Sequence, residues 1–114
     1  MARTKKTLFK PWETRNADGI EKRYIRLGVT QMSAEVMRKL SPAAVKIYIY
    51  MKLESGGNKQ FTFSHTKYSS YMSKPTFFRV VKELEEKGFI DVIERNGNLR
   101  KSNVYAFSDR WKTL

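Results

Sequence analysis

The chain has 114 residues, a length that suits one domain with a modest hydrophobic core. It carries 23 Lys and Arg against 11 Asp and Glu, and the formal net charge of +12 favours nucleic acid first and an acidic membrane surface second as its partner. The sequence has no cysteine, which excludes disulfides and thiolate metal sites, and no apolar run approaches the ~20 residues of a membrane-spanning helix. No secretory signal is evident either, so we expect a cytoplasmic protein.

Residues 1–22 are basic and rich in turn-forming residues, and we predict that they form an arm in front of a domain over 23–114. Leu8, Phe9 and Trp12 are its apolar exceptions, and they favour docking of the arm on the body or on a second subunit. A frayed terminus explains the same residues equally well. A basic arm can also enter a DNA minor groove.

The segment 23–29 alternates polar and apolar side chains, a pattern that is typical of a strand with one buried face. Ile25, Leu27 and Val29 share the apolar side. A short helix is expected to follow over 31–39.

A longer helix is predicted from Pro42 to about Ser55. Ser41 is a suitable N-cap, because its hydroxyl can accept a hydrogen bond from a free amide of the first turn. Proline suits that first turn, where its missing amide is not needed. Gly56 and Gly57 end the helix. Because the helix is apolar nearly all round, we expect it to lie in the core or to be partly covered by a second subunit.

A short strand over 59–63 and a short helix over 64–71 come next. Ser64 is predicted to cap this helix, and Tyr68 to face inward. A turn of one or two residues then leads to a helix over 73–88. Two helices joined by so short a turn form a helix-turn-helix, whose second helix enters the major groove of DNA.

The second of these helices has two different faces. Ser73 is a good N-cap, and Phe77, Val81 and Leu84 recur at helical spacing to form one apolar stripe. The opposite face offers Arg79 with other polar residues. A helix with one buried face and one cationic face suits the major groove, although an ordinary solvated surface helix would have the same pattern.

Two alternating strands follow Gly88 and are predicted to pair as a β-hairpin, because Asn96-Gly97 between them is a strong hairpin signal. Trp111 is expected to pack back on the body. The predicted fold is therefore α+β, with about four helices, a short strand, a C-terminal hairpin and the extra N-terminal strand.

One junction in this second half has a distinctive pattern. Its residues are Leu84-Glu85-Glu86-Lys87-Gly88-Phe89-Ile90, preceded by Ser73, Thr76 and Arg79. In this junction the leucine anchors a helix, the glycine turns the chain, and two apolar residues start a strand in register. On the basis of these residues, the sequence from Leu40 onward resembles a winged helix-turn-helix domain.

Two further segments carry the resemblance. Residues 73–79 are similar to the recognition helices of bacterial regulators and recombinases, and residues 103–111 to the end of winged domains in replication and regulatory proteins of plasmids and other mobile elements. The resemblance implies a protein that binds double-stranded DNA, as a transcriptional regulator or as an accessory replication or transfer factor of a mobile element.

Three groups of side chains would then contact DNA. The recognition helix would contribute Ser73, Lys74, Thr76, Phe78, Arg79 and Lys82. The preceding helix would hold phosphates with Ser64, Lys67 and Ser70. The wing over 94–103 would grip the backbone or a minor groove with Arg95, Asn98, Arg100 and Lys101. Arg79 is the best candidate for a base contact, because arginine pairs bidentately with guanine. Phe78 would touch a thymine methyl or wedge into the core beside Phe77.

The sequence offers little for catalysis. His65 is its only histidine, so we expect neither a metal site nor a nucleophile–base pair, and we predict no enzymatic activity and no cofactor. Glu83, Glu85 and Glu86 are interpreted as solvated charges that keep the end of the helix away from phosphate.

Two other classes of function stay open. A winged-helix protein–protein assembly module would use the apolar helix that begins at Pro42, and an RNA binder would need exposed aromatics on a sheet. A homodimer is a candidate state, because symmetric sites double the number of base pairs that a small domain reads. We expect no membrane partner, and no small-molecule ligand is evident.

Overall fold

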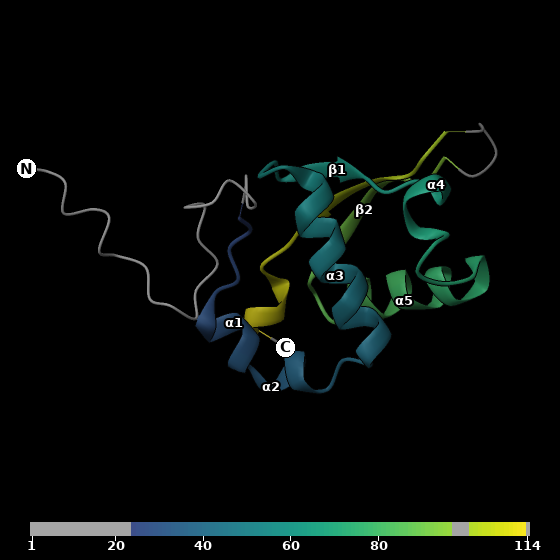
Figure 1. Cartoon of the computed structure of the whole chain (residues 1–114). Helices are drawn as coiled ribbons and strands as arrows, with labels where there is room; N and C mark the ends of the chain where they lie inside the picture. Colours follow the sequence, from purple (N-terminus) through teal and green to yellow (C-terminus); the bar gives the residue numbers. More distant parts are fainter. Residues whose placement is uncertain (1–23, 97–100, 114) are drawn as a thin grey trace, which may run out of the picture.

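The computed structural model describes residues 24–96 and 101–113. Over these residues the chain forms five α-helices, a three-stranded antiparallel sheet and a C-terminal 3-10 helix, η3 (Arg110–Thr113) (Figure 1). The predicted α+β class is confirmed. The N-terminal arm, Asn98 and Arg100 lie outside the described residues, as does Gly97 of the hairpin signal.

The predicted strand over 23–29 is wrong. Residues 24–28 have no regular structure, and α1 (Val29–Ser33) begins inside the alternating segment. The side chains of Leu27 and Val29 are 37% and 80% exposed, so the alternation does not reflect a buried face. Alternation of polar and apolar residues over so short a segment does not form a strand unless the segment can pair with a sheet and pack against a core.

The predicted helix over 31–39 is divided in two. Ala34 has an extended backbone, with φ −64° and ψ 147°, and it separates α1 from α2 (Glu35–Arg38). Met37 of α2 is buried in the core.

The helix α3 (Pro42–Ser55) begins and ends where the sequence predicts. The Ser41 hydroxyl accepts a hydrogen bond from the Ala44 amide at 3.2 Å, and Gly56 follows in the left-handed conformation with φ 61°. The helix packs against both β1 and α5, and its buried face runs along its full length. The buried residues of α3 are Ala44, Ile47, Tyr48, Met51 and Ser55.

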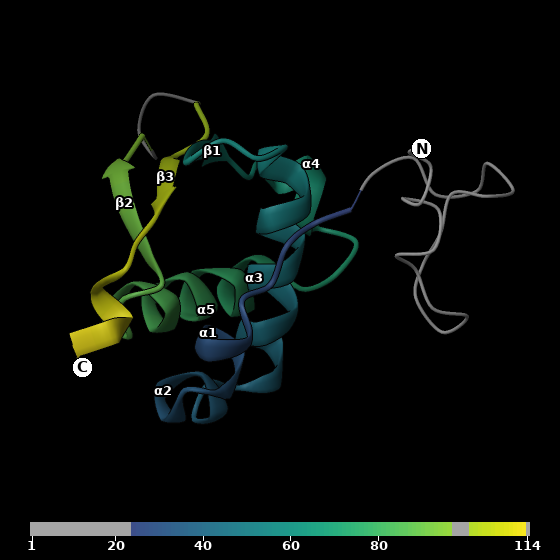
Figure 2. The same ribbon diagram turned by 90° about the vertical axis from the view of Figure 1, so that its left-hand side faces the viewer.

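The sheet is built from β1 (Gln60–Thr62), β2 (Ile90–Glu94) and β3 (Val104–Phe107), in the order β1-β3-β2. The predicted pairing of the last two strands is confirmed, and Figure 2 shows β2 and β3 side by side beyond the end of α5. The central strand is β3, in which Tyr105 stands opposite Phe61 of β1 and Val92 of β2.

The two helices after β1 are shorter than predicted. These are α4 (His65–Tyr68) and α5 (Lys74–Glu86). The predicted turn of one or two residues between them is wrong, because α4 ends early and the connection spans 69–73. Ser64 occupies the N-cap position of α4 as predicted, but its hydroxyl forms a hydrogen bond of 2.9 Å with the Thr66 hydroxyl rather than with a backbone amide. Tyr68 faces inward as predicted.

The chain turns from α5 into β2 at Gly88, which has a φ of 82°. A Cβ atom there would lie 2.5 Å from the backbone nitrogen of Trp111, so only glycine fits without a shift. The Trp111 backbone amide donates a hydrogen bond to the Gly88 carbonyl at 3.1 Å. The Trp111 ring stacks on the Phe89 ring, with the ring centroids 6.0 Å apart. The prediction that Trp111 packs back on the body is confirmed.

Candidate nucleic-acid interface

The buried face of α5 holds this helix firmly in the domain. Phe77, Val81 and Leu84 are buried as predicted, and Val80 joins them. The Phe77 ring stacks on Tyr68 of α4 with ring centroids 3.7 Å apart. The apolar contacts therefore decide which side chains of α5 face outward.

The start of α5 is capped by Ser73, as the sequence predicts. Its hydroxyl accepts a hydrogen bond from the Thr76 amide at 3.4 Å and donates to the Thr76 hydroxyl at 3.0 Å. Both predicted hydroxyl groups therefore take part in the cap.

The outward face of α5 is cationic. Lys74, Arg79 and Lys82 are exposed, and none of the three makes an ion pair with another described residue. The Lys74 ammonium lies 5.7 Å from the ring centroid of Phe78, within the range of a cation–π contact. Phe78 is 53% exposed, so the interpretation that it wedges into the core is wrong.

A hollow of about 340 Å³ lies beside the start of α5. It is formed by the beginning of α4, the first turn of α5 and the residues just before β3. The hollow brings together predicted site residues from three separate segments, which are Ser64, Lys74, Phe78 and Lys101. It also includes Thr66, which the sequence reasoning missed. The sequence does carry a signal for Thr66, because it is a second hydroxyl residue two positions after Ser64, in the segment predicted to contact phosphates.

Other predicted site residues are engaged elsewhere. Lys67 forms a salt bridge of 2.8 Å with Glu54 at the end of α3. Arg95 binds both carboxylate oxygens of Glu85, at 3.1 and 2.8 Å, through one guanidinium nitrogen. Ser70 is exposed in the connection between α4 and α5. The charges of Lys67 and Arg95 are therefore partly compensated, although exposed pairs of this kind are weak.

The interpretation of the α5 glutamates as solvated charges is wrong for two of them. Glu83 accepts hydrogen bonds from both the backbone amide and the hydroxyl of Ser41, each at 2.7 Å. Glu85 holds Arg95. Of the three glutamates, Glu86 alone is exposed, and it has no ion-pair partner among the described residues. The reason is tertiary, because packing of α5 on α3 places Glu83 over the first turn of α3.

The described ranges, 24–96 and 101–113, contain no cluster of three or more His, Asp or Glu that could hold a metal ion. None of the helices in these ranges is long and apolar enough to cross a bilayer. A scan against protein-family models, a search of curated proteins and a search of solved structures each found no match for this chain.

Proposed function

We propose that this chain is a winged helix-turn-helix protein that binds double-stranded DNA, with α5 in the major groove. The observation that carries the proposal is the outward face of α5, where Lys74, Arg79 and Lys82 make no ion pair with a described residue. A helix with its side chains is about 10–12 Å across, which matches the ~12 Å width of the major groove.

The hollow beside α5 supports the same orientation. A duplex lying along α5 would bring its backbone past the start of the helix, where Ser64, Thr66 and Lys101 meet. Hydroxyl and ammonium groups in such a position fix the register of a protein on DNA through phosphate contacts. In this proposal β2, β3 and their connection form the wing. The resemblance to plasmid proteins adds a role as a regulator or as an accessory replication or transfer factor.

The experiment that tests this function is selection of bound duplexes from a random pool, followed by titration of the selected duplex at several salt concentrations. We expect one converged motif and an affinity that falls steeply with salt, because binding releases counterions from phosphate. A palindromic motif would indicate a dimer. A pool that does not converge, with equally weak binding to every duplex, would refute sequence-specific recognition.

A protein–protein assembly module is the second candidate, and exposed apolar side chains favour it. Val29 is 80% exposed, and Leu27 and Leu53 are each 37% exposed. Sedimentation analysis of the full chain without DNA tests this alternative. A stable oligomer that binds no duplex would favour assembly, whereas a monomer that binds the selected duplex would favour DNA recognition. A competition experiment, in which structured RNA and the duplex compete for the protein, tests the RNA-binding alternative.

A further inference from the structure

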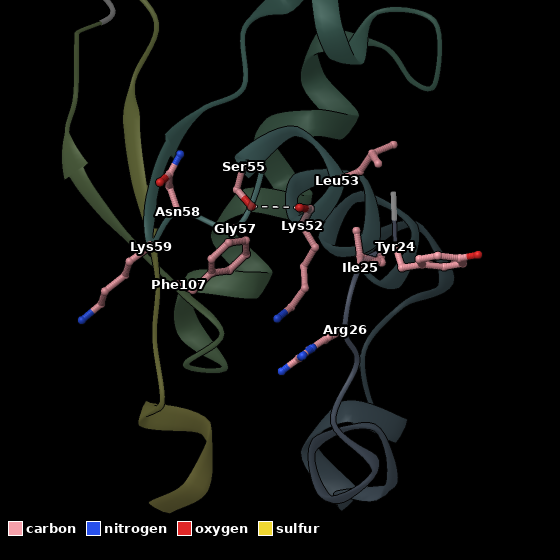
Figure 3. Close-up of a pocket in the computed structure, with 11 residues that line it drawn as sticks. Tyr24, Ile25, Arg26, Lys52, Leu53, Ser55, Gly57, Asn58, Lys59 and Phe107 are labelled. Carbon is pink, nitrogen blue, oxygen red and sulfur yellow. Dashed lines mark hydrogen bonds between the residues drawn. The ribbon is translucent and has the colours of Figure 1, made fainter. Parts of the chain in front are cut away.

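A second and larger hollow, of about 800 Å³, lies away from the α5 surface (Figure 3). Its walls are residues 24–26, the last turn of α3, the loop 56–59 and Phe107. It shares no lining residue with the hollow beside α5. A ligand here would therefore occupy a site that is separate from the proposed DNA surface.

The lining of this hollow is cationic. Arg26, Lys52 and Lys59 belong to it, and its described lining residues include no Asp or Glu. None of these three cations forms an ion pair with a described residue. In Figure 3 the side chains of Lys52, from α3, and Arg26, from the segment 24–26, extend toward the same side of the hollow. Cations gathered without a counter-charge favour an anionic ligand.

Lys52 is held in place by aromatic rings rather than by a carboxylate. Its ammonium lies 5.6 Å from the ring centroid of Tyr48 and 5.1 Å from that of Phe107. These contacts restrict the side chain and leave the charge uncompensated. Because Lys52 lies in the last turn of α3, its positive charge also interacts favourably with the helix dipole. Lys52 is therefore a pre-organised cation, which loses little conformational entropy when an anion binds.

The rest of the lining combines apolar side chains with the polar residues Tyr24, Ser55 and Asn58. Ile25 and Phe107 contribute apolar side chains on two sides of the hollow, and Leu53 lies at its edge with its side chain directed away from Lys52 (Figure 3). Small-ligand sites have typical volumes of about 300–1,000 Å³, with mostly apolar walls and a few placed polar groups. A simple inorganic anion would leave this apolar surface uncovered, and a neutral hydrophobic molecule would leave the cations unpaired.

We propose that this hollow binds a small aromatic anion, a flat apolar ring system that carries a phosphate or a carboxylate group. The charged group binds Lys52 and Arg26, and the ring covers Ile25 and Phe107. This site is independent of the proposed DNA-binding function, because Lys74, Arg79 and Lys82 take no part in it.

The test is a titration of the full ¹⁵N-labelled chain, observed by NMR at the amides of Gly56, Gly57 and Asn58. Two probes supply the alternative anionic groups: adenosine 5′-monophosphate for phosphate and 1-naphthoate for carboxylate. Adenosine and inorganic phosphate are the controls, each of which lacks one half of the ligand. We expect saturable shifts at these three amides with at least one probe, and an affinity for either control that is weaker by about tenfold or more.

Single substitutions then test the charged contacts. Lys52→Gln and Arg26→Gln should each weaken probe binding by about tenfold. The matched control Lys87→Gln removes an exposed charge at the end of α5 and should leave probe binding within about twofold. The proposal is overturned if neither probe gives saturable shifts at the three amides, if adenosine or phosphate binds as tightly, or if both hollow variants bind as the unmodified chain does. If the Lys52→Gln variant still binds DNA, the hollow and the DNA surface are separate sites.

Discussion

Ser41 and Glu83, which are 42 positions apart in the sequence, are joined by two hydrogen bonds of 2.7 Å. Ser41 donates both its backbone amide and its hydroxyl to the carboxylate, while the same hydroxyl accepts from the Ala44 amide. The residue that caps the central helix α3 is thus held by a side chain of α5. This contact joins α5 to the start of α3, in addition to the apolar contacts that hold α5 in the core.

The first prediction concerns this contact. Glu83→Ala removes the acceptor of two donors, one of them a backbone amide, and should lower the free energy of unfolding by about 2 kcal/mol. Urea denaturation monitored by circular dichroism measures the change. Glu86→Ala, at an exposed position of the same helix, is the matched control and should change stability by less than about 0.5 kcal/mol. Equal stability of the two variants would mean that the Ser41–Glu83 bonds contribute nothing.

The second prediction tests the outward face of α5. Arg79→Ala and Lys82→Ala should each weaken binding of the selected duplex by about tenfold, because each removes a charged contact. The Lys82 change should act on all duplexes alike and reduce the salt slope by about one, whereas the Arg79 change should also relax preference at one base pair. Fluorescence anisotropy at several salt concentrations measures both effects.

The control for these variants is Lys87→Ala, which removes an equal charge just beyond the end of the same helix. It should weaken duplex binding by no more than about twofold. If all three variants lose affinity equally, binding would depend on net charge alone, and the orientation proposed for α5 would be incorrect.

The third prediction uses the pair of Glu85 and Arg95. Glu85→Gln removes the carboxylate that holds the Arg95 guanidinium and frees that cation for a phosphate, so duplex binding should become about threefold tighter. Glu86→Gln removes the same negative charge without releasing a cation and should give a smaller gain. Anisotropy titrations compare the two variants. A larger gain for Glu86→Gln would show that Arg95 lies away from the duplex.

The fourth prediction concerns the turn at Gly88. Gly88→Ala places a Cβ 2.5 Å from the Trp111 nitrogen and 2.7 Å from the Arg110 carbonyl carbon, and it also forces alanine to a φ of 82°. We expect a loss of about 3 kcal/mol or more in unfolding free energy. Gly57→Ala is the control, because its φ is 90° but its Cβ would have nothing within 4 Å.

For Gly57→Ala only the backbone strain remains, so the loss should be about 1 kcal/mol. Thermal unfolding monitored by circular dichroism compares the two proteins. Similar melting temperatures would mean that η3 moves away to accommodate the new methyl group at Gly88.

The fifth prediction is a pH dependence at Tyr48. Burial raises the pKa of this phenol above 10.0, the hydrogen bond from Gln31 opposes the rise, and Asp109 adds to it. Because the folded pKa is the higher one, the unfolded chain loses this proton first. The stabilisation is therefore complete below pH 10.0 and is lost as the pH rises from there through the folded pKa.

Tyr48→Phe removes this titration. At neutral pH the variant should be less stable by about 1 kcal/mol, because the Gln31 amide loses its acceptor. As the pH rises past about 10, the stability of the unmodified chain should fall toward that of the variant. Urea denaturation of both proteins from about pH 8 to about pH 11 measures the difference. A constant difference over this range would contradict the raised pKa.

Features that depend on a few neighbouring residues could be predicted from the amino-acid sequence. Ser41 and Ser73 cap their helices as predicted, because a hydroxyl three positions before a free amide is a local arrangement. The apolar stripe of α5 is buried and Arg79 is exposed, because helical periodicity alone separates the two faces. These local signals were enough for the α+β class and for the limits of α3.

Which charged side chains are available to a ligand depends on how elements far apart in the sequence pack together. Arg95 and Lys67 looked equivalent to Lys82 in the sequence, but each is paired with a glutamate from another element. The sequence predicted that Glu83 is a solvated charge, but the packing of α5 on α3 brings its carboxylate to Ser41. Such contacts join residues far apart in the chain, so the positions of the packed elements decide them, and no local pattern encodes those positions.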